Sequence, residues 1–246
     1  HYHVFLEGKY WYDYIKSLGW GNCADFYITG IPKLDPLFWK DHYKPEELRK
    51  KLGLDKNKKT VLFAPSYKPS CIGFVQSKIT ELLPKYNLII KLHPYSWGGK
   101  YASHSQHRFY EKLAARNPDV FLIEKEDFDI YPYLVLADTL ISDTSSVINE
   151  FLALKKHGVI YVLPMHKLKH SDGMESVSID QAKWLKGAFT HMFQPDDLLP
   201  AVEKALNPTD EMKKKLEEYR KYFFTELDGK ASVRVKAKIN ELMEKR

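Results

Sequence analysis

The sequence predicts an α/β protein built on a doubly wound, Rossmann-like parallel sheet. From residue 60 onward, short apolar runs rich in β-branched residues alternate with amphipathic stretches of helical length. The short runs are continuously apolar, as expected for parallel strands that are buried on both faces. Strands separated by helices of this length form right-handed βαβ units, so helices should cover both faces of the sheet.

The predicted strands and helices follow one another in a regular order. The strands are 60–64, 87–92, 119–124, 139–142 and 159–163. The helices between them are 73–85, 107–116, 129–136 and 145–155, and Asp129 is the expected cap of the third. Beyond Pro164 the polar residues 166–180 predict a loop, and further helices are expected at 195–206, 210–222 and 231–245.

Composition sets limits on the class of protein. The 246 residues are 44% apolar and 14% aromatic, which is enough for a substantial core. Cys23 and Cys71 lack metal-ligand spacing and are predicted to be ordinary thiols in a reducing compartment. No apolar run approaches the roughly 20 residues that span a bilayer, and no signal peptide is visible. The net charge of +6 suits an anionic substrate, a membrane surface or nucleic acid, without choosing among them.

The stretch 137–150 carries the strongest functional signal. A short apolar strand runs directly into Asp143, Thr144, Ser145 and Ser146, and an apolar-periodic helix follows. Unpaired N–H groups at a helix start, together with hydroxyl donors, form a site suited to phosphate. The alternative is that Asp143, Thr144 or Ser145 simply caps the helix. No Glu or Gln stands three residues after any of these hydroxyls, so a capping box is absent and both interpretations stay open.

Polar residues also follow the other predicted strands, at the edge where open parallel sheets bind ligands. They are Ser66 and Lys68 after the first strand, Lys91 and His93 at the end of the second, Glu124 and Lys125 after the third, and His166 after the fifth. Ser66 has the alternative of shaping a Pro-flanked turn, and Lys68 that of a solvated charge. His93 lies between an apolar strand and a proline, which favours a functional role.

Two common cofactor motifs are missing from the chain. Neither the dinucleotide signature GxGxxG nor the P-loop GxxxxGK[ST] occurs, which argues against NAD and ATP enzymes of those kinds. We therefore predict no cofactor and no metal.

Five segments, in order, resemble motifs of the CDP-glycerol glycerophosphotransferase family, the teichoic acid glycerol-phosphate primases and polymerases of GT-B architecture. They are GIPKLD (30–35), VLFAPSYK (61–68), LIIKLHP (88–94), ADTLISDTSSVINEF (137–151) and DGKASVR (228–234). Single motifs of this kind are weak, whereas five in order over most of the chain are specific. The resemblance implies the C-terminal, donor-binding domain of a GT-B enzyme.

The resemblance also implies roles for residues at matching positions. The predicted catalytic residues are His93 and Asp143, and the predicted donor-binding residues are Ser66, Lys68, Ser142, Thr144, Ser145, Ser146 and Glu150. Thr144 and the two following serines would grip the pyrophosphate, and Lys68 would pair with a phosphate oxygen. Glu150 is expected beyond the first helical turn, where its carboxylate would accept from a ribose or glycerol hydroxyl.

The sequence departs from the family pattern in three places. Lys33 and Lys68 stand where arginine is usual, and the tract after Pro164 lacks the expected aromatic and acidic pattern. The acceptor domain, with a second catalytic His in a His-Gly motif, is not recognisable, because His3 lacks the following Gly. We therefore expect 1–45 to be a remnant of an N-terminal domain and its connection, 46–228 the nucleotide-donor-binding domain, and 229–246 a C-terminal helix.

The resulting hypothesis is transfer of glycerol phosphate from CDP-glycerol to a hydroxyl of a lipid-linked or polyol-phosphate acceptor, releasing CMP. His93 would hydrogen-bond the transferred phosphoryl group or act as acid or base. The expected location is the cytoplasm, with or without peripheral contact to the inner face of the cell membrane, and no nucleic-acid partner is expected. Two alternatives remain: a GT-B glycosyltransferase or epimerase using a nucleotide sugar, and a non-catalytic module that binds polyanions through its lysines.

Overall fold

A computed structural model describes residues 2–76, 78–98, 106–164 and 180–244. The chain forms two compact units. Unit 1 comprises His1–Tyr43, Ala153–Lys155 and Glu217–Arg246, and unit 2 comprises Lys44–Leu152 and Lys156–Leu216. None of the described helices combines the length and the apolar character needed to cross a bilayer. The domain ranges given above stay a prediction, because these units describe only the packing within this chain.

Unit 2 contains a six-stranded parallel sheet in the order β5-β4-β3-β6-β7-β8. Its strands are β3 (Lys59–Phe63), β4 (Tyr86–Ile90), β5 (Val120–Leu122), β6 (Thr139–Ser142), β7 (Val159–Tyr161) and β8 (Thr190–Met192). Numbered from the first of them, the spatial order is 3-2-1-4-5-6, the order of a doubly wound Rossmann-type sheet. The predicted fold class is confirmed.

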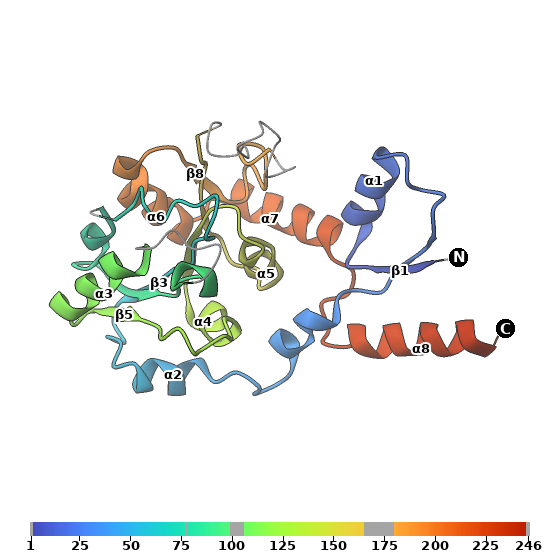
Figure 1. The fold of residues 1–246 in the computed structure, drawn as a ribbon, viewed down its shortest axis with the longest axis horizontal. Coiled ribbons are helices and arrows are strands. Elements are labelled where there is room, and N and C mark those ends of the chain that lie inside the picture. Colours follow the sequence, from blue (N-terminus) through green and yellow to red (C-terminus); the bar gives the residue numbers. More distant parts are fainter. Residues whose placement is uncertain (1, 77, 99–105, 165–179, 245–246) are drawn as a thin grey trace. The chain divides into compact units, whose positions relative to one another are not determined.

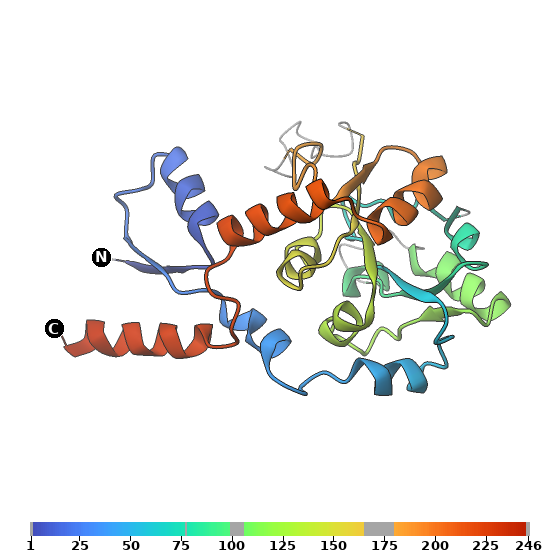
Figure 2. The same ribbon diagram turned by 180° about the vertical axis from the view of Figure 1, so that it is seen from behind.

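Helices flank this sheet on both sides (Figure 1, and from behind in Figure 2). Val61 and Phe63 on β3 are fully buried in a core that they share with α3 (Gln106–Arg116), α6 (Leu198–Leu206) and the 3-10 helix η2 (Lys78–Leu82). The intervening Leu62 is fully buried on the other face. The helical elements of the unit are α2 (Pro45–Lys51), η2 (Lys78–Leu82), α3 (Gln106–Arg116), α4 (Tyr131–Leu136), α5 (Val147–Ala153), η5 (Pro195–Asp197) and α6 (Leu198–Leu206). Helix α7 (Asp210–Phe223) begins here and ends in unit 1.

The predicted elements of unit 2 are largely present, with three differences. The described residues of the predicted helix 73–85 form turns and the short η2, although Ile72, Val75, Ile79 and Leu82 are buried at helical spacing as the pattern required. Strand β8 and helix α2 were not predicted. Most of the predicted loop 166–180, His166 included, lies outside the described residues.

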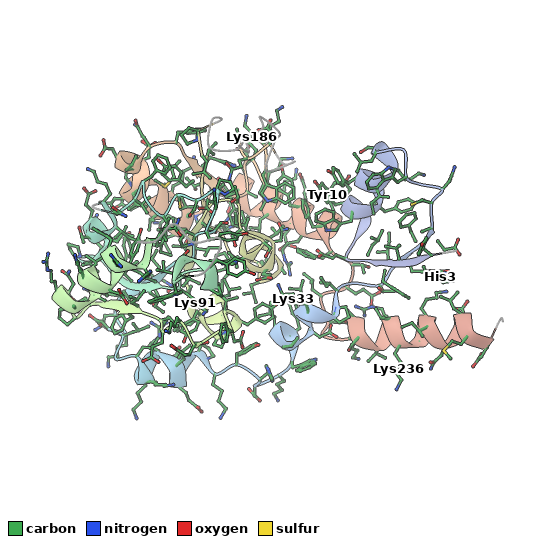
Figure 3. The ribbon with its side chains drawn as sticks, in the orientation of Figure 1. His3, Tyr10, Lys33, Lys91, Lys186 and Lys236 are labelled. Atoms are coloured by element: carbon green, nitrogen blue, oxygen red, sulfur yellow. The ribbon has the colours of Figure 1, made fainter. Side chains whose placement is uncertain are left out.

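Unit 1 contains a two-stranded parallel sheet of β1 (His3–Leu6) and β2 (Asp25–Ile28). Helix α1 (Lys9–Ser17) connects the two strands. The ring of Tyr10, labelled in Figure 3, stacks on Phe223 of α7 with centroids 4.3 Å apart. Tyr10 thereby packs α1 against α7 within this unit.

Two of the five motif segments meet inside unit 1. Asp35, on the 3-10 helix η1 (Pro32–Phe38), accepts the backbone N–H groups of Ala231 and Ser232, both at 2.8 Å. These are the first residues of α8 (Ala231–Glu244), so the carboxylate caps that helix from a distant part of the chain. The Trp39 indole N–H donates to the carbonyl of Gly229 at 2.9 Å. The segments 30–35 and 228–234 therefore have a structural role in this unit.

Candidate functional site

The strand order places the candidate site where β3 and β6 lie side by side. The chain leaves β3 toward β4 and β5 on one side and returns to β6 on the other, so this pair is the switch point of the sheet. Ligands of open α/β sheets bind outside the carboxyl ends of the strands at such a point. The loops that leave β3 and β6 there contain most of the predicted site residues.

Asp143 joins these two loops. Its Oδ1 accepts the N–H of Ser66 at 2.8 Å and that of Thr144 at 2.6 Å, and its Oδ2 accepts the N–H of Cys71 at 2.6 Å. The side chain is 2% exposed. Burial raises the pKa of its carboxyl group, and the amide donors of Cys71 and Ser66 oppose that rise. Both oxygens are thus engaged in shaping the loops.

The hydroxyl groups of Ser142 and Thr144, next to Asp143, also form hydrogen bonds between the two loops. Ser142 is fully buried, and its Oγ donates to the carbonyl of Ala64 at 2.7 Å. Thr144 Oγ1 donates to the carbonyl of Pro69 at 3.0 Å. Both bonds run from the β6 side to the β3 side, so with those of Asp143 four hydrogen bonds hold the two loops together. Neither hydroxyl hydrogen remains available to a ligand in this arrangement.

Ser145 and Ser146 are placed differently. Helix α5 begins at Val147, and the carbonyl of Ser146 accepts the helical bond from Glu150, which makes Ser146 the N-cap residue. Among the described residues, the N–H groups of Ser145, Ser146 and Val147 find no acceptor, and neither do the two serine hydroxyls. These donors form a group at the switch point that an anion would satisfy.

The late start of α5 corrects two expectations. None of Asp143, Thr144 and Ser145 occupies the cap position, because Ser146 does. Glu150 belongs to the first turn of the helix and is 5% exposed, so the expectation that it lies beyond that turn was wrong. The cause is that Asp143 and Thr144 make hydrogen bonds to the loop after β3 and lie outside the helix.

The loop after β3 contributes a cation. Lys68 is exposed and makes no ion pair within the part of the chain that the structure describes. Ser66 is half-buried, its N–H is held by Asp143, and its carbonyl accepts from Ser70 Oγ at 2.6 Å. The peptide bond between Lys68 and Pro69 is cis. An ammonium group on the loop that Asp143 holds can supply a point charge to a phosphate oxygen.

His93 follows β4, on the other side of the β3 loop. It precedes the 3-10 helix η3 (Pro94–Ser96), and its Nδ1 accepts the N–H of Tyr95 at 3.1 Å. Its ring lies 4.6 Å from the ring of Tyr67, centroid to centroid. Burial lowers the pKa of the imidazole, and the charge of Asp143 partly opposes this. His93 is therefore neutral at physiological pH.

The aromatic partners of His93 were not among the predicted site residues. Tyr67 and Tyr95 lie 5.0 Å apart, edge to face, and Tyr95 lies 5.3 Å from the imidazole. Gln106, on α3, donates to the Tyr67 carbonyl at 2.9 Å. Both tyrosines lie within two residues of a predicted site residue, and this proximity in the sequence was the only feature that could have identified them. The loops after β3 and β4 are thereby in contact.

Lys91 has a structural task at the same edge. Its ammonium group donates to the carbonyl of Asp127 and lies 5.8 Å from the ring centroid of Tyr133 (Lys91 is labelled in Figure 3). Burial lowers its pKa. The Tyr133 hydroxyl donates to Asp127 Oδ2 at 2.5 Å, which closes the network. Lys91 thus holds the loop after β5.

No group of three or more metal-binding side chains occurs among the described residues.

Curated proteins with similar sequences act in teichoic acid synthesis. The chain is 25% identical over 219 residues to the teichoic acid ribitol-phosphate primase of Bacillus spizizenii, covering 84% of this chain and 50% of that protein. It is 26% identical over 149 residues to the teichoic acid ribitol-phosphate polymerase TarK of Staphylococcus aureus, covering 56% and 27%. The chain therefore spans half the length, or less, of these relatives.

Solved structures share the fold. The wall teichoic acid polymerase TagF aligns with a TM-score of 0.66 at 18% identity, covering 99% of this chain and 58% of that chain. A UDP-N-acetylglucosamine 2-epimerase aligns with a TM-score of 0.53 at 16% identity, covering 90% and 53%. The predicted GT-B-like fold is confirmed by the first of these likenesses.

The family itself is shown by its sequence model. The model of CDP-Glycerol:Poly(glycerophosphate) glycerophosphotransferase matches residues 19–241, nearly the whole chain. All five motif segments fall inside this range. The chain belongs to the CDP-glycerol:poly(glycerophosphate) glycerophosphotransferase family.

Proposed function

We propose that the chain is the donor-binding part of a transferase that moves glycerol phosphate from CDP-glycerol, or a related nucleotide-diphosphate donor, to a hydroxyl group. The acceptor is a lipid-linked or polyol-phosphate chain, and CMP is released. Family membership supports the reaction class. A TagF variant soaked with CDPG is among the structures that share this fold, with a TM-score of 0.66, which supports the donor class.

One observation carries the proposal. The N–H groups of Ser145, Ser146 and Val147 have no acceptor among the described residues, and they lie at the switch point beside a loop that bears Lys68. A diphosphate supplies acceptor oxygens and negative charge to such a set of donors. Ser66 belongs to the same loop, and Glu150 would accept from a hydroxyl of the donor.

The proposed chemistry relies on position and charge. Phosphoryl transfer needs an aligned acceptor and stabilisation of charge more than covalent help from the protein. Lys68 and the free N–H groups would stabilise charge on the leaving phosphate, and His93 would contact the transferred group. We assign Asp143 and Ser142 a positioning role, since their polar atoms already hold the loops together.

Two other functions remain candidates. The likeness to a UDP-N-acetylglucosamine 2-epimerase favours a nucleotide-sugar enzyme, because that fold presents the same sheet edge. A non-catalytic module would bind polyanions through its lysines and would ignore nucleotides. The net charge of +6 suits an anionic acceptor or the inner membrane surface, and binding to anionic vesicles should then fall as salt rises.

The test is a calorimetric titration of the chain with CDP-glycerol, CDP-ribitol, CDP, CMP and UDP-N-acetylglucosamine. The proposal expects the cytidine diphosphates to bind more tightly than CMP or the uridine ligand. Preference for the uridine ligand would replace it with the nucleotide-sugar function. Polymer binding without nucleotide binding would support the non-catalytic module.

Matched variants locate the site. Ser145→Ala/Ser146→Ala and Lys68→Ala should each weaken CDP binding about tenfold, the loss expected for a hydrogen bond to a charged oxygen. Lys56 is also exposed but precedes β3, at the opposite edge of the sheet. Lys56→Ala should therefore bind CDP as the wild type does.

A further inference from the structure

Phe128 lies in the loop that joins β5 to α4, two elements labelled in Figure 1, and is 74% exposed. The ammonium group of Lys91, which directly follows β4, donates to the carbonyl of Asp127, so this loop lies at the carboxyl edge of the sheet. Among the described residues of unit 2, the other exposed large apolar side chains are Tyr95 and Phe193, which follow β4 and β8. The exposed aromatic side chains of this unit therefore all follow strands at the edge that contains the candidate site.

The main chain on both sides of Phe128 is held by hydrogen bonds. Asp127 Oδ1 accepts the N–H of Asp129 at 3.2 Å, and Asp127 Oδ2 accepts the hydroxyl of Tyr133 at 2.5 Å. Asp129 Oδ1 in turn accepts the N–H of Tyr131, at the start of α4, at 2.9 Å. Single exposed rings are common on protein surfaces. This one is presented by a preorganised segment, which reduces the entropy lost when a ligand binds.

The main-chain polar groups of Phe128 are not engaged within the described part of the chain. Its N–H has no acceptor there, and its carbonyl has no donor. A nucleobase offers acceptors and, in cytosine, an amino donor on one planar edge. Proteins hold unpaired bases by stacking them on aromatic rings and by hydrogen bonds to such edges. Phe128 therefore combines a stacking surface, a donor and an acceptor at one position.

The charge of the loop determines which end of a nucleotide it can accept. Residues 124–129 contain four acidic side chains and one lysine, so this segment repels phosphate. The proposed diphosphate site lies beside the loop that bears Lys68, at the ends of β3 and β6. In the order β5-β4-β3-β6, β5 lies two strands from β3, about 10 Å across the sheet. A nucleotide, whose ribose separates the base from the phosphates, spans such a distance.

We propose that Phe128 is the stacking platform for the base of the nucleotide donor, and that its main-chain N–H and carbonyl bind the edge of that base. The inference rests on the proposed function, since the phosphates of the same nucleotide occupy the switch point. The loop after β5 then binds the base, and the loops after β3 and β6 bind the diphosphate.

Binding to the full chain tests the platform. Phe128→Ala should weaken CDP binding about tenfold, a loss typical of a removed base–aromatic stack, and leave the binding of inorganic pyrophosphate unchanged. Phe128→Tyr keeps the ring and should bind CDP as the wild type does. The matched control is Phe193→Ala, which removes an exposed ring at the other end of the sheet and should also bind CDP normally.

The base itself reports the stacking. In a 1H NMR titration, the H5 and H6 signals of the cytosine of CDP should move upfield with the wild type, because protons above an aromatic face are shielded, and should not with Phe128→Ala. No upfield shift with the wild type would overturn the platform, as would wild-type CDP affinity in Phe128→Ala or an equal loss of pyrophosphate affinity. If the wild type binds pyrophosphate as tightly as CDP, the platform fails while the anion site of the proposed function stands. If it binds neither, the proposed function fails as well.

Discussion

The backbone N–H of Cys71 donates to Oδ2 of Asp143 at 2.6 Å, and this bond joins the loop after β3 to the loop after β6. The other carboxylate oxygen binds the N–H of Ser66 in the same loop. The buried side chain of Asp143 therefore fixes both loops at the switch point of the sheet. Both oxygens of this motif residue accept main-chain N–H groups of the two loops.

Asp143→Asn should lower the free energy of unfolding by about 1–3 kcal/mol, because an amide N–H₂ would face the N–H of Cys71 and leave a buried donor unsatisfied. Donor affinity should fall with it, since the β3 loop loses its tie to β6. Urea titrations and calorimetry with CDP measure the two effects.

Asp138 provides the matched control for this variant. Its Oδ2 accepts the N–H of Thr60 at 2.8 Å, and its Oδ1 pairs with Lys59 at 2.9 Å, both at the amino edge of the sheet. Asp138→Asn should also cost stability, yet leave CDP affinity at the wild-type value. Equal loss of affinity in both variants would show that Asp143 has no special link to the site.

Much of the site could be predicted because polar residues after buried strands must meet at one edge of the sheet. That reasoning placed Ser66, His93 and the 143–146 run correctly at this edge. It could not separate side chains that face a ligand from those that hold a loop. Ser142 illustrates this, since its type and position suit a ligand while its hydroxyl binds the Ala64 carbonyl.

The burial of Lys156 leads us to expect that the free energy of unfolding depends on pH. Its ammonium group donates to the carbonyls of Leu134, Val135 and Ala137 at the end of α4, and burial lowers its pKa to about 8. Between this pKa and the usual value of 10.5, the unfolded chain holds a proton that the folded chain has released. The free energy of unfolding should therefore rise with pH in that window, at up to about 1.4 kcal/mol per pH unit.

Lys156→Met isolates this contribution. Urea titrations between pH 8 and pH 10 should show a rise for the wild type and for the exposed control Lys213→Met, and a flatter profile for Lys156→Met. Parallel profiles for all three proteins would contradict the assigned pKa.

Substitution of Gly229 tests the contact between the chain around the motif segments 30–35 and 228–234 in unit 1. Its φ is +73°, and an added Cβ would lie 2.9 Å from Cδ1 of Trp39, a ring already held by its bond to the Gly229 carbonyl. Gly53 has a similar φ of +68° with nothing within 4 Å. Gly53→Ala should cost about 1 kcal/mol of unfolding free energy from backbone strain, and Gly229→Ala distinctly more. Thermal melts that show equal losses would contradict the contact.

The fold class could be predicted because buried parallel strands appear in the sequence as short, continuously apolar runs that alternate with amphipathic helical stretches. The five predicted strands all occur in the sheet. The three-residue β8 was missed because its sequence, Thr-His-Met, lacks the continuous apolar character of the equally short β5 and β7. The predicted helix at 73–85 failed for a different reason: its apolar residues are buried at helical spacing, but Gly73 and Pro84 and the β-branched residues between them disfavour a regular helix.

The central claim is that a nucleotide diphosphate binds at the carboxyl ends of β3 and β6. Backbone amide NMR of the 15N-labelled chain, titrated with CDP, tests it most directly. The account predicts the largest shifts at Ser145, Ser146, Val147 and the Ser66–Lys68 loop, and none at Lys56 or Asp138. Shifts centred on the amino edge of the sheet, or on unit 1, would contradict it.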